Sequence, residues 1–142
     1  MNINFGKAIM AGFIATIVLS LLMVLKTVIG LMPQMNVIKM LARMLGTGPL
    51  GGWLAHFVIG SIAWGIGFVV LFRFLPGKAP WLKGAIFAIG AWVLMMLIIM
   101  PMAGAGLFGV HLGIMAPIMT LVLHIVFGVV MGAVYGRPPA AA

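Results

Sequence analysis

Charged residues divide this chain into long apolar stretches. Residues 8–25, 44–72 and 84–136 carry no Lys, Arg, Asp or Glu, and the last stretch is long enough for two membrane crossings. A helix needs about 20 mostly apolar residues to cross the hydrocarbon core of a bilayer. Pro101 and the glycines after it place a turn inside the longest stretch. The pattern predicts four transmembrane helices, near residues 6–30, 50–74, 82–101 and 115–135.

A shorter amphipathic segment lies between the first two predicted spans. Asn36 can cap a helix there, and Lys39 and Arg43 lie four residues apart on one face of it. The other face is apolar and carries Val37, Met40, Leu41 and Met44. The pattern is typical of a short helix that lies in the membrane interface. Docking of this helix onto a partner protein is the alternative.

The second and fourth predicted spans contain the same pattern. Each has a proline, a histidine seven residues later and a glycine four residues after that: Pro49, His56 and Gly60, then Pro117, His124 and Gly128. The first and third spans show a weaker match between glycine pairs: Gly6 and Gly12, then Gly84 and Gly90. These matches predict an all-α membrane four-helix bundle of two repeated transmembrane hairpins, with both histidines at one depth.

Composition supports a membrane location and excludes several kinds of chemistry. Of 142 residues, 65% are hydrophobic and 6% are charged, whereas soluble domains carry about 25% charged residues. The sequence contains eight Lys and Arg residues and no Asp, Glu or Cys. Membrane proton relays and carboxylate bases need Asp or Glu, and thiolate chemistry needs Cys. We therefore expect no enzymatic activity, and no nucleic-acid partner because the cations form no stripe.

The distribution of cations predicts an orientation. One side of the membrane receives five cations: Lys7, Arg73, Lys78, Lys83 and Arg137. The other side receives Lys26, Lys39 and Arg43. The positive-inside rule then places both termini in the cytoplasm. We expect these cations to lie at the span ends, among anionic lipid head groups.

Small residues recur every fourth position along two spans. The fourth span has Ala116, Thr120, His124, Gly128, Gly132 and Gly136 in this spacing, and the second has Gly48, Gly52, His56, Gly60 and Trp64. Residues four apart share one face of a helix, and small residues let membrane helices approach closely. We expect Gly52, Gly60, Thr120, Gly128, Gly132 and Gly136 to pack helices together. The stripe on the fourth span should face the first span, the second span or a partner.

His56 and His124 are the residues that could carry a function. A neutral imidazole can ligate a metal, and two axial histidines can hold haem b in a helical bundle. Gly60 and Gly128 would then leave a slot for the flat ligand. The expected role is structural, with each imidazole hydrogen-bonded to Thr16, Ser20, Thr120 or a backbone carbonyl and no slot beside it. His111 should be a surface residue. The 14 Met residues could favour Cu(I), but gap filling explains them.

Several segments resemble a known family. They are Gly52-Trp-Leu-Ala-His-Phe-Val-Ile-Gly60, Met100-Pro-Met-Ala-Gly-Ala-Gly-Leu-Phe-Gly109, Leu121-Val-Leu-His-Ile-Val-Phe-Gly128 and Tyr135-Gly-Arg137. They resemble a family of small four-span bacterial membrane proteins of unknown function. The resemblance implies a multi-pass protein of the bacterial inner membrane and supplies no activity or cofactor.

Three functions remain open from the sequence. We expect first a structural or accessory subunit that packs against other membrane subunits or itself. The alternative is a b-type haem or metal-binding protein that uses His56 and His124. A further alternative is a channel or carrier for a small solute, with only Thr16, Ser20 and Thr120 to supply a polar pathway.

Overall fold

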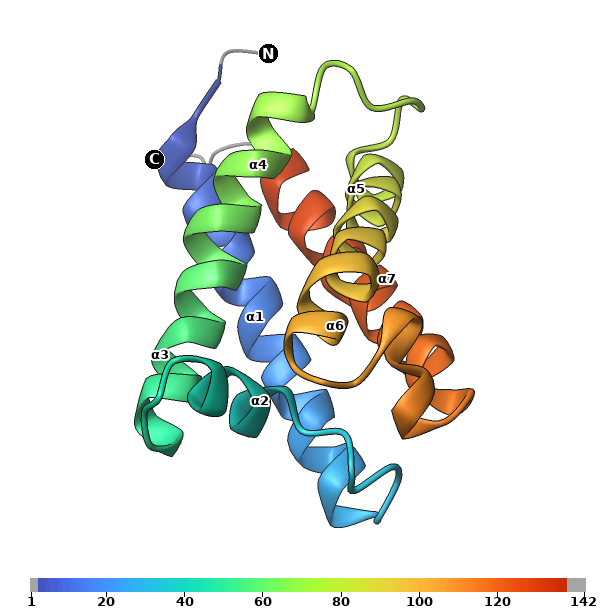
Figure 1. The fold of residues 1–142 in the computed structure, drawn as a ribbon. Helices are drawn as coiled ribbons and strands as arrows, with labels where there is room; N and C mark the ends of the chain where they lie inside the picture. The colour runs from blue at the N-terminus through green and yellow to red at the C-terminus, as the bar shows by residue number, and fades with distance from the viewer. Residues whose placement is uncertain (1–2, 138–142) are drawn as a thin grey trace.

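The computed structural model describes residues 3–137, and its regular elements there are all helical (Figure 1). Four segments are long and apolar enough to cross a membrane. The first is α1 (Phe5–Val28), and the second joins α3 (Pro49–Val58), the π-helical turn η1 (Ile59–Ala63) and α4 (Trp64–Leu71). The third joins α5 (Pro80–Leu94), the π-helical turn η2 (Met95–Ile99) and α6 (Met100–Met102), and the fourth is α7 (Met115–Gly136). The predicted all-α four-span fold is confirmed.

Local signals explain where the helices begin and how the third span turns into the fourth. The side chain of Asn4 accepts a hydrogen bond of 2.8 Å from the amide of Lys7 and so caps α1. Pro49 and Pro80 occupy first turns, where no amide hydrogen is needed. The loop before α7 contains the 3-10 helix η3 (Leu107–Leu112) and four glycines at positive φ: Gly104, Gly106, Gly109 and Gly113. Glycine adopts this conformation without steric cost.

The predicted connector helix is α2 (Val37–Met44), and it packs on the bundle. Asn36 caps it by accepting a hydrogen bond of 2.9 Å from the amide of Lys39. Its buried residues are Ile38, Leu41 and Ala42. A side chain at Gly52 would overlap the carbonyl of Ile38, so α2 crosses α3 at close range. The polar face, with Lys39 and Arg43, stays exposed.

Lys26 lies in a different environment from the one predicted. The sequence placed it among lipid head groups, but its side chain is only 8% exposed. Its ammonium donates to the carbonyls of Leu31 at 3.2 Å, Met32 at 2.9 Å and Met35 at 2.8 Å. An ammonium has three hydrogens, so these bonds use all of them. Lys26 therefore fastens the segment between α1 and α2 to the end of the first span.

Each hairpin is closed by a crossing of small residues. In the first hairpin, a Cβ atom at Gly12 would lie 2.6 Å from the carbonyl oxygen of Gly60, and one at Gly65 would lie 2.7 Å from that of Ala8. In the second hairpin, Gly84 and Gly128 would overlap each other's carbonyls in the same way. Only small residues allow such close approach of two backbones.

The crossings correct the predicted register of the repeat. Gly12 corresponds to Gly84 by its contacts, whereas the sequence paired Gly6 with Gly84. A Cβ at Gly6 would meet only Asn4, and one at Gly90 would meet nothing within 4 Å. The π-helical turn η1 inserts one residue into the first hairpin. Beyond this turn Gly65 corresponds to Gly132 of the second hairpin. These two glycines are one residue closer in the sequence than His56 and His124 are. Superposition of the two hairpins stays a prediction.

The small-residue stripe of α7 faces α5. A side chain at Gly132 would overlap the carbonyl of Pro80, and one at Gly136 would meet the Pro80 ring. The predicted partner, the first or second span, is therefore wrong for this stripe. A neighbouring face of α7 instead meets α1, through Ala8, Ala11 and Ala15 against Phe127 and Met131. The spacing of the small residues predicted which face of α7 packs closely, but it did not predict which helix this face contacts.

The described ends of the chain lie at one end of the bundle, and α2 lies at the other (Figure 1). The end with the termini is filled by aromatic rings: Phe68 stands 5.5 Å from Phe87 and 5.7 Å from Tyr135 between ring centroids. There the ammonium of Lys7 also donates to the backbone carbonyl of Arg137. We call the opposite end, with α2, the distal end. It is packed less completely.

Candidate ligand site

A cavity of about 680 Å³ lies between the two hairpins toward the distal end. Its walls come from the second half of α1, from α2, α3 and the π-helical turns η1 and η2, from the start of α4, from the end of α5 and from residues 119–127 of α7. Ligand pockets in proteins commonly enclose about 300–1,000 Å³. Turns of π-helix are frequent at functional sites. Size and position therefore suit a small-molecule site inside the membrane.

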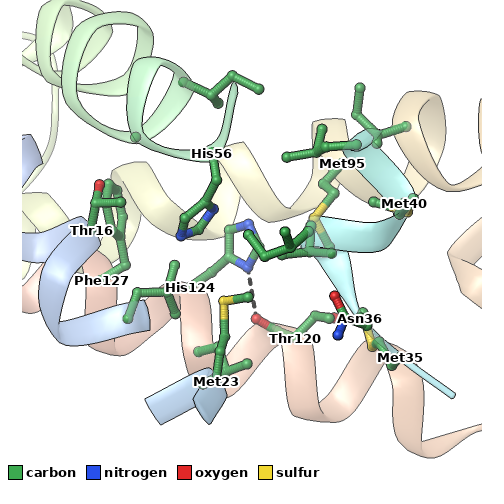
Figure 2. A pocket seen from close by; sticks show the side chains of 18 of the residues that line it. Thr16, Met23, Met35, Asn36, Met40, His56, Met95, Thr120, His124 and Phe127 are labelled. Carbon is green, nitrogen blue, oxygen red and sulfur yellow. Dashed lines mark hydrogen bonds between the residues drawn. The ribbon is translucent and has the colours of Figure 1, made fainter. Parts of the chain in front are cut away.

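The cavity lining is mostly apolar, with a few polar groups. Five methionines contribute: Met23, Met35, Met40, Met95 and Met119. Figure 2 shows four of them around the two histidines. Methionine side chains are flexible and adapt to irregular shapes. The wall therefore suits a large apolar body, and polar contacts are limited to defined points.

His56 projects into this cavity from α3 (Figure 2). The Ser20 hydroxyl donates its one hydrogen to the carbonyl of Thr16 at 2.7 Å. Ser20 must therefore accept at its other contact, 3.2 Å from Nε2 of His56. In a neutral ring the hydrogen is then on Nε2, and Nδ1 carries a lone pair. Nδ1 has no hydrogen-bond partner among residues 3–137.

His124 projects into the same cavity from α7 (Figure 2). Its Nδ1 lies 2.7 Å from the carbonyl oxygen of Thr120. A carbonyl only accepts, so Nδ1 carries the hydrogen and Nε2 carries the lone pair. No other described residue bonds to Nε2. Each imidazole thus keeps one nitrogen that carries no hydrogen and has no partner among the described residues, and both rings line the same cavity.

The structure contains part of the geometry that each of the two predicted roles of the histidines requires. The structural role required a hydrogen bond for each ring, and Ser20 and the Thr120 carbonyl supply them. It also required filled space, whereas both rings line the cavity. The cofactor role required a slot opened by two glycines. Gly60 does line the cavity, but Gly128 is packed against Gly84 and opens nothing. His111 is exposed and bonds the Gly104 carbonyl at 3.0 Å.

The sequence did not identify Trp92. Its indole nitrogen donates to the Thr120 hydroxyl at 3.1 Å and to the Pro117 carbonyl at 3.2 Å. Thr120 is thereby held from α5 while its carbonyl holds His124. The available signal was a tryptophan in the middle of a span, away from the interface that tryptophan favours. Trp92 is a positioning residue for the α7 side of the site.

Comparison with known proteins gives a family and no function. A family model described as "Family of unknown function (DUF6789)" matches residues 3–141. No curated protein and no solved structure matches the chain. Function must therefore be inferred from the cavity itself.

Proposed function

We propose that this chain, which belongs to that family of unknown function, is a membrane protein that binds haem b between His56 and His124. One observation carries the proposal: imidazoles from two different hairpins line one mostly apolar cavity of about 680 Å³, and each keeps one nitrogen without a hydrogen-bond partner among the described residues. Haem iron is held in proteins by one or two side-chain ligands, of which histidine is a common one. Two ligands are what this site offers.

The donor set favours haem over other ligands. Among residues 3–137 no group of three or more His, Cys, Asp or Glu side chains could hold a metal ion. A structural zinc site usually needs four such ligands, and a single ion needs far less space than this cavity. A quinone has carbonyl oxygens that accept hydrogen bonds, and at the histidines they would find no donor, because the unbonded nitrogens carry no hydrogen. Haem iron accepts the lone pairs that both rings present.

The surrounding residues position the two rings. Ser20 and the Thr120 carbonyl each hold the nitrogen that would not ligate iron, which fixes the orientation of the other. Such outer contacts also raise the basicity of a ligating imidazole. Haem held by both histidines would supply one-electron transfer. Ser20, Thr120 and Trp92 are positioning residues in this proposal.

Haem titration tests the proposal directly. Haem b added to the purified protein in mild detergent is expected to give a sharp Soret band that saturates at one haem per chain. The spectrum should be that of low-spin iron with two nitrogen ligands. Absence of a Soret shift would refute the proposal. The expected accessory role in a larger complex stays a prediction, and a stoichiometric partner in preparations from native membranes would support it.

The chain is proposed to lie in a bacterial inner membrane with both termini in the cytoplasm. The described ends of the chain, near residues 3 and 137, share one end of the bundle, and five of the eight Lys and Arg belong to that side (Figure 1). A cytoplasmic reporter fused after residue 142 is expected to be active, and a periplasmic reporter fused there inactive. The opposite pattern would contradict the orientation.

A further inference from the structure

The distal rim of the cavity is formed by the start of α2. Asn36 and Lys39 line the histidine cavity there, and they also line a second groove of about 520 Å³, here called the outer groove, between α2 and the segment from Met100 to Leu112. The crossing of α2 on α3 occurs at Gly52, four residues before His56. Four helical residues span about 6 Å along the axis. The rim therefore lies about one turn beyond the histidines, toward water.

The rim offers hydrogen-bond donors that the chain itself does not use. The Lys39 ammonium has no partner among residues 3–137, since only its backbone amide is bonded. The Asn36 oxygen accepts that bond, so the side-chain NH₂ group remains for a ligand. Lys26 also lines the cavity, but its three hydrogens are all given to carbonyls. Lys39 is therefore the available cation at this cavity.

The sequence contains no Asp or Glu side chain that could pair with Lys39. Its ammonium is therefore free to bind the carboxylate or phosphate of a ligand or a lipid. The site is also sorted by polarity. Its rim carries donors, its deeper part carries the lone pairs of His56 and His124, and methionines and aliphatic residues line the space between.

We infer that the cavity takes an amphipathic anion, whose carboxylate or phosphate binds Lys39 and Asn36 at the rim while its apolar body lies against the histidines. The inference rests on the proposed function and deepens it. Haem b belongs to this class, because its two propionate carboxylates lie along one edge of an otherwise apolar ring. They would point to the distal surface.

Paired ligands with and without the charge test the inference. Wild-type protein is expected to bind haem b at least about tenfold more tightly than iron protoporphyrin dimethyl ester, since a charge-assisted hydrogen bond is lost in the ester. Lys39→Met should abolish this preference and leave ester affinity unchanged. Arg43→Met is the matched control, because Arg43 shares the exposed face of α2 but lines only the outer groove.

The outcomes separate the two proposals. Equal affinity of the wild type for haem b and its ester, or a preference that survives Lys39→Met, overturns the inference and leaves haem binding intact. Failure of both porphyrins to bind refutes haem binding. A fluorescent long-chain fatty acid and its methyl ester then test the rim alone by the same criterion.

Titration in phosphatidylcholine and phosphatidylglycerol nanodiscs identifies the anion that the rim binds. If haem b is preferred over its ester in both kinds of nanodisc, the rim binds the carboxylate of the ligand. If the preference is lost in phosphatidylglycerol nanodiscs, the rim binds the phosphate of the lipid.

Discussion

His56→Ala and His124→Ala are each expected to abolish the low-spin haem spectrum and to weaken haem binding at least about tenfold. Each substitution would remove one of the two side chains proposed to ligate the iron. Absorbance spectra of the reconstituted variants measure both effects. The fold should survive, because a lost hydrogen bond within a membrane costs only about 0.6–2 kcal/mol.

His111→Ala provides the control for these variants. It removes an imidazole of the same kind from an exposed loop outside the cavity, so the spectrum and the affinity should stay as in the wild type. An unchanged low-spin spectrum in His56→Ala or His124→Ala would show that the iron is bound elsewhere, and the proposed site would be wrong.

Gly128→Leu is expected to break the packing of the second hairpin. A side chain there would overlap the carbonyl of Gly84 and the methyl group of Ala88, and α5 and α7 would have to separate. Overfilling a packed site costs about 1–3 kcal/mol, and overlap with backbone should place the loss of unfolding free energy at the top of this range or above it. Denaturation of the protein in mixed micelles measures the loss.

Gly90→Leu is the matched control, since Gly90 lies in the middle of α5 with nothing within 4 Å of its Cβ position. It should change the free energy of unfolding by less than about 0.5 kcal/mol. Similar losses for both variants would mean that the α5–α7 crossing does not depend on the absence of a side chain at Gly128.

Features set by neighbouring residues were predicted well. Uncharged stretches defined the spans, Asn36 marked the start of α2, and the glycines after Pro101 marked the turn. Packing between distant helices was predicted less well. The stripe on α7 identified a close contact, but small residues fit any neighbouring backbone, so its partner α5 could not be read from spacing. The inserted residue in η1 likewise leaves no mark in composition.

The candidate site shows the same division. His56 and His124 were found from the sequence, because an unusual polar residue in an apolar span is visible without a structure. Ser20, the partner of His56, was one of several candidates that the sequence left open. Lys39 and Asn36 were assigned only to the connector helix. Their place at the cavity depends on how α2 folds back over α3, which rests on the carbonyl of Ile38 meeting Gly52.

The separate closure of the two hairpins bears on how the protein is made. The first hairpin holds all the residues of its own glycine crossing and is complete before α5 is synthesised, and α7 closes the second in the same manner. Each pair of helices can therefore assemble as it leaves the insertion machinery. The cavity forms only when the two hairpins meet, chiefly through α1 and α7, so ligand binding is expected to depend on this last step of assembly.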